Sequence, residues 1–252
     1  MLLAFDIGNT NIKTGLFDGD DLISLKVFSS PDNIFPELSA FDINRVAVSS
    51  VVPGLTLKIT EIIKEKLNLS AFIISAKSRF GVKINYDNPE TLGIDRICSA
   101  EGAYSIFKKS NDFNTFDSKT FLVAIDFGTA TTINIVGFPG IFLGGIIAPG
   151  IKTMMSSLKL NTAQLPEIDF ESYKGFIGKD TKSSIASGII NSTIGLIEKI
   201  LSFIKTELNS EKTHIFVTGG NAETIIRHLN FQYHYEKGLV LKGIKSVYDQ
   251  NN

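Results

Sequence analysis

One short phrase occurs twice in this sequence of 252 residues. FDIGNTNIK at 5–13 and IDFGTATTI at 125–133 each end an apolar run in Asp, followed by one apolar residue, Gly and a Thr-bearing turn. Asp, Gly, Asn and Thr are ordinary turn residues, so one copy alone predicts only a turn. Two copies, each opening a similarly ordered half of the chain, indicate a duplication at the scale of a domain.

Each half is expected to open with three strands that include a hairpin, and to continue with mixed strands and helices. The stretch 181–209 repeats apolar residues at helical spacing, which predicts the longest helix of the chain. Further helices are expected within 55–68 and near 95–109. The expected strands lie within 2–7, 12–28, 45–53, 71–75, 119–128, 131–136, 141–150 and 214–220.

A polar stretch, KKSNDFNTFDSK at 108–119, separates the halves. It has few apolar anchors and comes directly before the second strand that ends in Asp. The sequence therefore predicts two domains, at 1–117 and 118–252. Hydrophobic residues form 43% of the chain, which is enough for a substantial core.

Composition argues against several classes of partner. The net charge is −1, from 25 basic and 26 acidic residues, so there is no electrostatic reason to expect nucleic acid or an anionic membrane. Cys98 is the only cysteine, which excludes an intrachain disulfide and argues against a Cys-based zinc site. The histidines show no spacing typical of metal ligands; they are His214, His228 and His234.

The expected location is the cytoplasm. The start, MLLAFDIG, lacks the basic region and long apolar run of a signal peptide. Apolar runs are interrupted before about 18 positions, so no transmembrane helix is expected. A single cysteine also fits a reducing compartment.

The repeated phrase has the chemistry of a phosphate-binding turn. Gly8 and Gly128 let the backbone approach a ligand closely, and the hydroxyls of Thr10 and Thr129 can donate to phosphate oxygens together with backbone N–H groups. A carboxylate beside a polyphosphate repels it unless a cation lies between them. Asp residues at both strand ends therefore predict Mg²⁺ or another cation.

In these two phrases the chain resembles the actin, sugar kinase and Hsp70 superfamily, whose members have two halves that each begin with such a loop. More narrowly, it resembles type III pantothenate kinases. No single motif decides this, whereas the ordered set is specific and covers most of the chain. The motifs are DIGNTNIK (6–13), SSVVP (49–53), YDNPETLGIDR (86–96), DFGTATTI (126–133), GGIIAPG (144–150), GKDTKSSIASG (178–188) and VTGGNAE (217–223).

This resemblance implies an α/β fold of duplicated actin-like (ribonuclease H-like) domains, each a mixed five-stranded sheet with flanking helices. It places the active site in the cleft between the domains. The implied reaction is ATP-dependent phosphorylation of the pantothenate hydroxyl to 4'-phosphopantothenate, the first step of coenzyme A biosynthesis. The implied cofactors are Mg²⁺ and a monovalent cation, K⁺ or NH₄⁺, and the implied assembly is a homodimer with the substrate pocket at or near the subunit interface.

For the nucleotide, the resemblance implies that Asp6 holds Mg²⁺, directly or through water, and that Asp126 holds the monovalent cation. Two plain alternatives stay open: Lys13 as a solvent-facing hairpin residue, and Asp126 as a hydrogen-bonded turn residue. VTGGNAE is implied to lie near the adenine, with a simple strand-end turn as its alternative. The residues implied to bind ATP are Asp6, Ile7, Gly8, Asn9, Thr10, Asn11, Ile12, Lys13 and Thr129.

The stretch GIDRICSAEGAY contains the implied base, Asp95. A helix N-terminus and the adjacent Arg96 would both favour its ionised form, which makes it an available but weak base. Phosphoryl transfer tolerates a weak base because positioning and charge stabilisation supply much of the catalysis. Arg96 suits a substrate carboxylate as a planar bidentate donor. The alternative is an N-cap Asp beside a surface Arg.

Tyr86 and Thr181 match family positions that contact pantothenate, although Tyr86 could be an ordinary loop aromatic and Thr181 an N-cap of the long helix. Two positions depart from the family pattern: Ile94 where Ala is common, and Lys179-Asp180 where Arg-Asn is common. The residues implied to bind substrate are Tyr86, Gly93, Ile94, Asp95, Arg96 and Thr181.

Other interpretations are weaker. GGIIAPGIKT nearly matches a P-loop, but Ile151 displaces the Lys by one position, so a strand and turn are expected there. No Gly-x-Gly-x-x-Gly follows a strand. Two rival functions remain: a kinase for another small hydroxylated metabolite, and an inactive regulatory or binding protein on the same fold.

Overall fold

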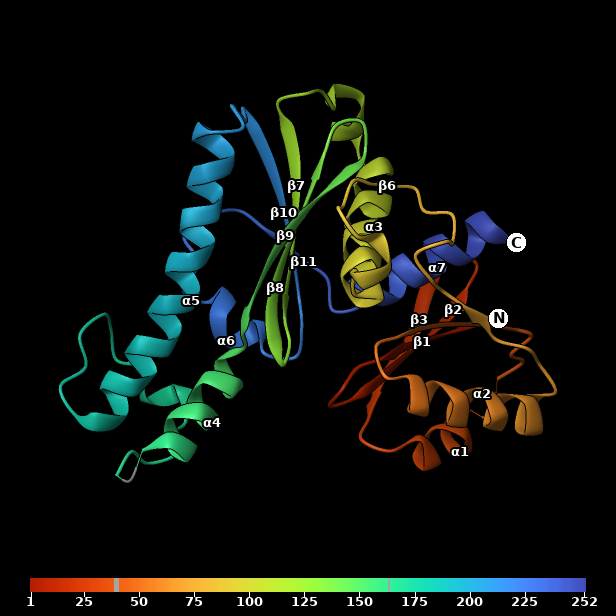
Figure 1. Ribbon diagram of the computed structural model, residues 1–252, viewed down its shortest axis with the longest axis horizontal. Coiled ribbons are helices and arrows are strands. Elements are labelled where there is room, and N and C mark those ends of the chain that lie inside the picture. The colour runs from red at the N-terminus through yellow and green to blue at the C-terminus, as the bar shows by residue number, and fades with distance from the viewer. Residues whose placement is uncertain (39–40, 163) are drawn as a thin grey trace. The chain divides into compact units, whose positions relative to one another are not determined.

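The computed structural model describes residues 1–38, 41–162 and 164–252 (Figure 1). The chain divides into two compact units that interleave along the sequence. Unit 1 comprises Met1–Phe116, Asn134–Gly144 and Gly238–Asn252, and unit 2 comprises Asp117–Ile133 and Gly145–Lys237. The first break lies between Phe116 and Asp117, and two later segments return to unit 1. The two domains at 1–117 and 118–252 stay a prediction.

Unit 1 is built on a five-stranded sheet in the order β3-β2-β1-β4-β5. β1 pairs antiparallel with β2 and parallel with β4, so the sheet is mixed, as predicted. β2 and β3 form the predicted hairpin. The strands are β1 (Leu2–Ile7), β2 (Ile12–Asp18), β3 (Asp21–Phe28), β4 (Arg45–Ser50) and β5 (Phe72–Ile73).

Both faces of β1 are buried, because helices cover the sheet on each side (Figure 1). Leu3, Phe5 and Ile7 point to one core, where they meet helix α2 (Pro53–Leu67) through Ile59 and Ile63. The alternate residues of β1 join a second core with helix α7 (Leu239–Asn251) and with Cys98 of helix α3 (Ile94–Lys108). This period-two alternation between two covered faces explains the continuous apolar run of LLAFDI.

Helices α3 and α7 pack at backbone contact distance. A Cβ on Gly243 would lie 1.8 Å from the Cys98 carbonyl oxygen, and one on Gly102 would lie 2.1 Å from the Leu239 carbonyl oxygen. Glycine at these two positions permits the close crossing. Unit 1 also holds the short elements η1 (Pro31–Asn33), α1 (Ile34–Leu38), β6 (Lys83–Ile84), η2 (Pro89–Thr91) and η3 (Asn111–Thr115).

The second sheet has the order β11-β10-β7-β8-β9-β6. It has six strands where five were expected, because the two-residue strand β6 pairs in parallel with β9. Two-residue strands give no periodic signal, which is why the sequence did not reveal this edge. The other strands are β7 (Thr120–Phe127), β8 (Ala130–Gly137), β9 (Ile141–Pro149), β10 (Lys212–Thr218) and β11 (His234–Tyr235).

Unit 2 carries the long predicted helix, α5 (Thr181–Thr206). Before it, the chain forms helix α4 (Ile151–Asn161), where the sequence predicted only a strand and turn; the strand ends at Pro149 and the helix follows Gly150. Short elements complete the unit: η4 (Phe170–Ser172) and α6 (Ala222–Ile226).

Among the described residues, α5 is the one helix long and apolar enough to cross a membrane by length and composition alone. In the apolar window, 39% of the residues are buried inside the protein. Core helices of globular proteins meet the same criteria, so this is weak evidence for a membrane span.

Candidate functional site

The first predicted phosphate loop is a tight turn between β1 and β2. The N–H of Gly8 donates to the carbonyl of Asn11 at 3.0 Å, which closes the turn. Ile7 and Ile12 pair across the hairpin with buried side chains, so only their backbone can meet a ligand. The side chains of Asn9, Thr10 and Asn11 are exposed. The strand pair thus presents three short polar side chains at its open end.

Asp6 lies at the base of this loop and is only 7% exposed. The sheet register places it between Lys13 on β2 and Ser49 on β4. The Lys13 ammonium lies 3.7 Å from Asp6 Oδ2, and the Lys13 side chain is 24% exposed. Lys13 therefore lies over the carboxylate instead of extending into solvent.

Helix α3 begins at Ile94, with Gly93 as its N-cap and Asp95 in its first turn. The N-cap alternative for Asp95 is therefore wrong. Asp95 Oδ1 accepts the N–H of Arg96 at 2.8 Å. A Cβ on Gly93 would lie 2.6 Å from the same oxygen, so glycine leaves room for the carboxylate to fold back over the helix start.

Arg96 is buried, 6% exposed, so its alternative as a surface residue is also wrong. Its Nε donates to Oδ1 of Asn134 on β8 at 2.9 Å. Nη2 of Arg96 and Nδ2 of Asn134 are buried without a hydrogen-bond partner in the described protein. The amide of Asn134 is neutral and does not offset the charge of the guanidinium, and burying a charge is costly unless an anion pairs with it. The Arg96 and Asn134 side chains are therefore suited to bind an anion.

The Asp6 and Asp95 carboxylates both affect the pKa of the same buried thiol, that of Cys98. Burial raises the pKa of Cys98 well above its usual value, and the charges of Asp6, Glu101 and Asp95 raise it further. Cys98 packs against β1, which ends in Asp6 and Ile7, and it follows Asp95 by three residues on α3, so the two carboxylates belong to one corner of unit 1.

Tyr86 follows β6 and lies against β9. Its ring centroid is 6.2 Å from that of Phe142, and a Cβ on Gly144 would lie 3.7 Å from the Tyr86 ring. Tyr86 is partly exposed. The Tyr86 ring is therefore held in place by packing and is still partly accessible, which suits a residue that contacts a ligand.

The second loop, in unit 2, is closed by the Gly128 N–H donating to the Ala130 carbonyl at 3.0 Å. Thr153 Oγ1 donates to the Thr129 carbonyl at 2.6 Å, which ties the loop to α4. Asn221 Nδ2 donates to the Gly128 carbonyl at 3.0 Å, from the turn after β10. Sequence reasoning missed Thr153 and Asn221. Asn221 lies in the quoted motif VTGGNAE, which was the available signal.

Gly219 lies beside the Asp126 carboxylate of the second loop. Its φ is +106°, and a Cβ there would lie 2.5 Å from Asp126 Oδ1 and 2.4 Å from the Phe127 nitrogen. Gly219 thus makes room for the Asp126 carboxylate and the end of β7. An added Cβ on Gly220 would have nothing within 4 Å, so open space for a ligand remains at that glycine.

Thr181 is the first residue of α5 and is exposed. The N-cap is Asp180, which forms a capping box with Ser183; the N-cap alternative for Thr181 is therefore wrong by one residue. Thr181, Asp180 and Lys179 line an open cavity of about 1050 Å³ beside α4 and α5. The rest of its wall is largely apolar, including Met154, Leu158 and Ile185.

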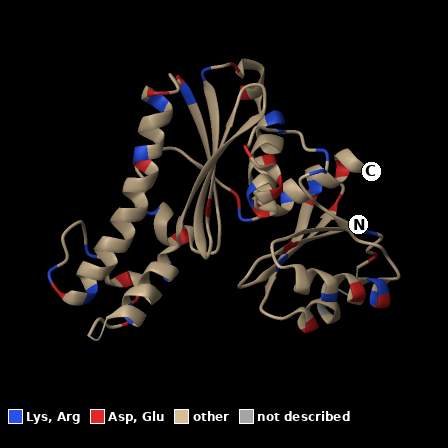
Figure 2. Cartoon of the chain, viewed as in Figure 1, with Lys and Arg blue, Asp and Glu red and all other residues tan. Residues whose placement is uncertain are grey.

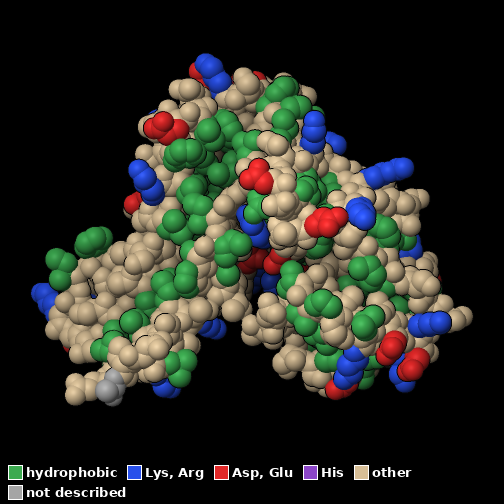
Figure 3. All heavy atoms as spheres, viewed as in Figure 1, with side chains coloured by type: hydrophobic (Ala, Val, Ile, Leu, Met, Phe, Trp, Pro, Cys, Tyr) green, Lys and Arg blue, Asp and Glu red, His purple; other side chains and the backbone are tan. Residues whose placement is uncertain are grey.

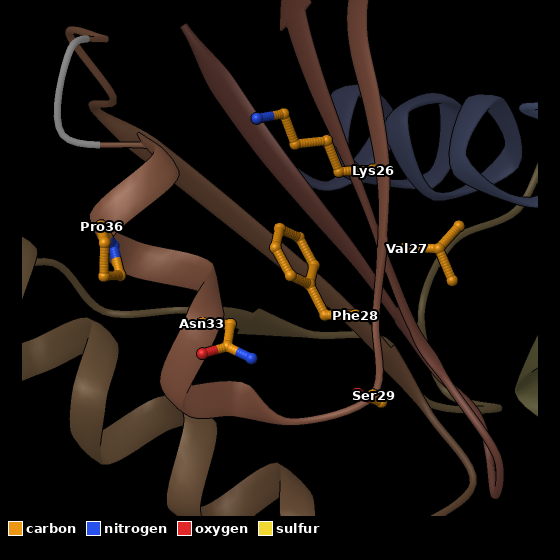
Figure 4. A pocket seen from close by; sticks show the side chains of 6 residues that line it. All are labelled: Lys26, Val27, Phe28, Ser29, Asn33 and Pro36. Atoms are coloured by element: carbon orange, nitrogen blue, oxygen red, sulfur yellow. The ribbon is translucent and has the colours of Figure 1, made fainter.

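A second cavity, of about 570 Å³, lies in unit 1 at the end of β3 (Figure 4). Figure 4 shows Lys26, Phe28 and Asn33 around it. None of the predicted site residues lines this cavity, so its size alone does not make it a substrate site.

No group of three or more His, Cys, Asp or Glu suited to a metal occurs among the described residues. Mg²⁺ beside a nucleotide is typically bound by one or two carboxylates together with phosphate and water oxygens, so a single carboxylate at each loop fits such a cation. Charged side chains lie mainly on helices and loops (Figure 2). On the face drawn in Figure 3, basic and acidic side chains are interspersed.

A sequence model of the type III pantothenate kinase family matches residues 2–203. This chain belongs to that family. A type III pantothenate kinase of Sulfurihydrogenibium sp. (strain YO3AOP1) is 35% identical over 97% of this chain and 98% of its own length. That of Agathobacter rectalis is 34% identical over 100% of this chain and 98% of its own.

Solved structures of other proteins are similar to this chain in fold. A conserved Campylobacter jejuni protein, named as a Baf family transcriptional activator, has a TM-score of 0.62 at 22% identity, covering 99% of this chain and 98% of its own. A ROK hexokinase from Thermus thermophilus has a TM-score of 0.50 at 12% identity, covering 98% and 97%. These likenesses confirm the predicted actin-like α/β fold. The family membership makes the chain a kinase that uses ATP and a divalent metal to phosphorylate pantothenate, in coenzyme A biosynthesis.

Proposed function

We propose that the Asp6, Asp95 and Arg96 corner of unit 1 carries the transfer of the ATP γ-phosphoryl group to the pantothenate hydroxyl, giving 4'-phosphopantothenate. The observation that supports this most directly is the buried Arg96, whose guanidinium has a neutral protein partner and an unpartnered Nη2. Such a group is suited to a small anionic metabolite. Pantothenate supplies a carboxylate for it.

In this proposal Asp95 is the base. It accepts the proton of the substrate hydroxyl as that oxygen bonds to the γ-phosphorus and the bond to ADP breaks. The transition state is loose, so placing the hydroxyl contributes more than the strength of the base. The hydrogen bond from the Arg96 N–H to Oδ1 orients the Asp95 carboxylate for this role. Tyr86 and Ile94 would form the apolar edge of the pantothenate site.

For the nucleotide, residues 6–13 bind ATP phosphates with backbone N–H groups and the exposed Asn9, Thr10 and Asn11. Lys13, next to Asp6, adds positive charge there. Mg²⁺ associates with Asp6, directly or through water, and brings the phosphates toward a carboxylate that would otherwise repel them. Thr129 contacts ATP, and Asp126 holds K⁺ or NH₄⁺.

We further propose a cytoplasmic homodimer formed through the α4 and α5 surface. Three large apolar residues near the cavity lined by Thr181 are strongly exposed: Leu160 at 81%, Phe176 at 78% and Ile177 at 78%. Soluble monomers rarely keep such side chains together in water. A second copy of this chain would cover them and would bring Thr181 into a substrate pocket closed at the interface.

A coupled assay of ADP release with pantothenate, Mg²⁺ and K⁺ tests the reaction. We expect release that depends on pantothenate, and none with hydroxylated metabolites that lack its carboxylate. Asp95→Asn should lower kcat by a factor of at least about 100, since a general base contributes 10²–10⁴. Its ATP affinity should stay within about twofold.

Asp21→Asn, at an exposed position of β3, is the matched control and should keep wild-type turnover. ADP release that ignores pantothenate would refute the reaction. Wild-type turnover in Asp95→Asn would instead remove only Asp95 from the base role.

A further inference from the structure

A buried carboxylate outside the proposed catalytic corner joins three separate segments of unit 1. Glu101, on α3, is 1% exposed. Its Oε2 accepts the N–H of Val82 at 2.9 Å. Its Oε1 accepts Ser246 Oγ–H at 2.6 Å and Gln250 Nε2–H at 2.9 Å, both from α7. Three neutral donors thus bind one buried carboxyl group, without a basic residue among these partners.

The neighbouring backbone is shaped around this carboxylate. A Cβ on Gly81 would lie 2.8 Å from Glu101 Oε1, so a larger residue there would displace the carboxylate. Two residues earlier, Arg79 exchanges hydrogen bonds with Asn251 of α7: the Arg79 N–H donates to Oδ1 at 3.0 Å, and Nδ2 donates to the Arg79 carbonyl at 2.9 Å. The segment 79–82 is therefore held by side chains of α7 and α3 at both ends.

This segment leads directly into the substrate-contact residue. β6 follows it, and Tyr86 comes two residues after β6. The same Glu101 lies on the helix whose first turn carries Asp95 and Arg96. One carboxylate therefore links the segment that leads to Tyr86 with the helix that carries Asp95 and Arg96.

We infer that Glu101 is a positioning residue for pantothenate: through Val82, Ser246 and Gln250 it fixes the Tyr86 segment against α3. This inference rests on the proposed substrate roles of Tyr86 and Arg96. Glu101 does not touch the reacting atoms. Loss of Glu101 would displace Tyr86, which is proposed to contact the substrate. It would therefore weaken pantothenate binding and leave the nucleotide loop unchanged.

The test compares Glu101→Gln with Glu65→Gln, an exposed control on α2. The amide keeps the size of the side chain but presents an N–H₂ group to at least one of the three donors. In full-length protein well below its unfolding temperature, we expect the pantothenate KM to rise about tenfold, the cost of one misplaced hydrogen bond. The ATP KM should stay within about twofold in both variants.

Hydrogen exchange provides a readout that needs no turnover. Peptides that cover 80–86 should exchange faster in Glu101→Gln, while peptides of β1 and the 8–11 turn should be unchanged. If Glu101→Gln does not fold, Ser246→Ala removes one donor and keeps the carboxylate, and it should shift the pantothenate KM in the same direction by about threefold.

Equal changes in both KM values would show a general loss of structure and overturn the inference. So would an unchanged pantothenate KM in folded Glu101→Gln. Absence of pantothenate-dependent ADP release in the wild-type protein would refute the proposed function itself, which separates the two failures.

Discussion

At the scale of single residues, the most informative contact is between Arg96 and Asn134. The Asn134 amide oxygen orients the Arg96 guanidinium by accepting a hydrogen bond from Nε. The amide is neutral, so it does not offset the positive charge of the guanidinium. An acid at this position would compete with an anionic substrate, and an apolar residue would leave Nε unsatisfied. Asn134 was not predicted from sequence, because Asn in a strand has many ordinary explanations.

We expect Asn134→Leu to lower the free energy of unfolding by about 1–3 kcal/mol, because a buried charged donor loses its acceptor. The pantothenate KM should also rise, since Arg96 is no longer oriented. Urea denaturation and steady-state kinetics measure the two effects. Asn114→Leu, at an exposed position of η3, is the control. Unchanged stability in Asn134→Leu would contradict the importance of this contact.

Asp20 gives a pH-dependent prediction. Its carboxylate lies 2.8 Å from the Lys109 ammonium and 2.9 Å from that of Lys245. Hydrogen bonds from Lys109 and then Lys245 lower the pKa of Asp20 from 3.8 to about 2. Because the folded pKa lies below the unfolded one, the stabilisation is present above about pH 4 and is lost as pH falls toward 2.

The effect should be below about 1 kcal/mol, since the Asp20 side chain is largely exposed and solvent screens it. Wild type should therefore exceed Asp20→Asn slightly in stability at pH 6, and the difference should vanish near pH 2. Chemical denaturation at several pH values measures this. A difference that grows on acidification would show that the sign is wrong.

At the scale of elements, the crossing of α3 and α7 sets the position of the proposed base. Gly243→Ala would place a methyl group 1.8 Å from the Cys98 carbonyl, so the helices must separate. We expect a loss of about 3 kcal/mol or more in the free energy of unfolding, at the upper end for overpacking.

Gly195→Ala is the matched control, because this exposed α5 glycine has nothing within 4 Å of an added Cβ. It should stabilise the protein by about 0.5–1 kcal/mol through helix propensity. Thermal and urea unfolding of both variants provide the comparison. Equal changes in the free energy of unfolding for the two substitutions would mean that α3 and α7 can move apart without loss of stability.

The elements also show which sequence signals were sufficient. LLAFDI, the hairpin and α5 were predictable because burial on one or both faces leaves a clear apolar period. α4 was missed because Gly150 and the preceding apolar run resembled the end of a strand and a turn. α7 was missed because Val240, Leu241 and Ile244 pack in a core assembled from distant parts of the chain, which no local pattern shows.

At the scale of the whole molecule, the exposed Leu160, Phe176 and Ile177 bear on assembly. Phe176→Asp combined with Ile177→Asp should convert the proposed dimer to monomer, because charged groups would have to be buried at the interface. Sedimentation velocity over a range of concentrations measures this. Val27→Asp, another exposed apolar position but on β3 of unit 1, should leave the mass unchanged. A wild-type protein that is already monomeric would refute the dimer.

The candidate site was predictable in its parts and less so in its arrangement. Asp6, Asp95 and Arg96 were identified by resemblance, and their burial and partners came only from the structure. Lys13 over Asp6 follows from strand register, which a turn of the right length fixes. The roles of Asn134, Glu101 and Asn221 depend on contacts between residues far apart in sequence, so no motif could supply them.

The place of α7 in unit 1 has a consequence for biosynthesis. Residues 239–251 complete a core begun by residues 2–7, so this core cannot close until residues 239–251 have left the ribosome. At about 5–20 residues per second, the first strand waits roughly 10–50 s for its last helix. Until then the apolar face that α7 will cover is open to chaperones and to other nascent chains.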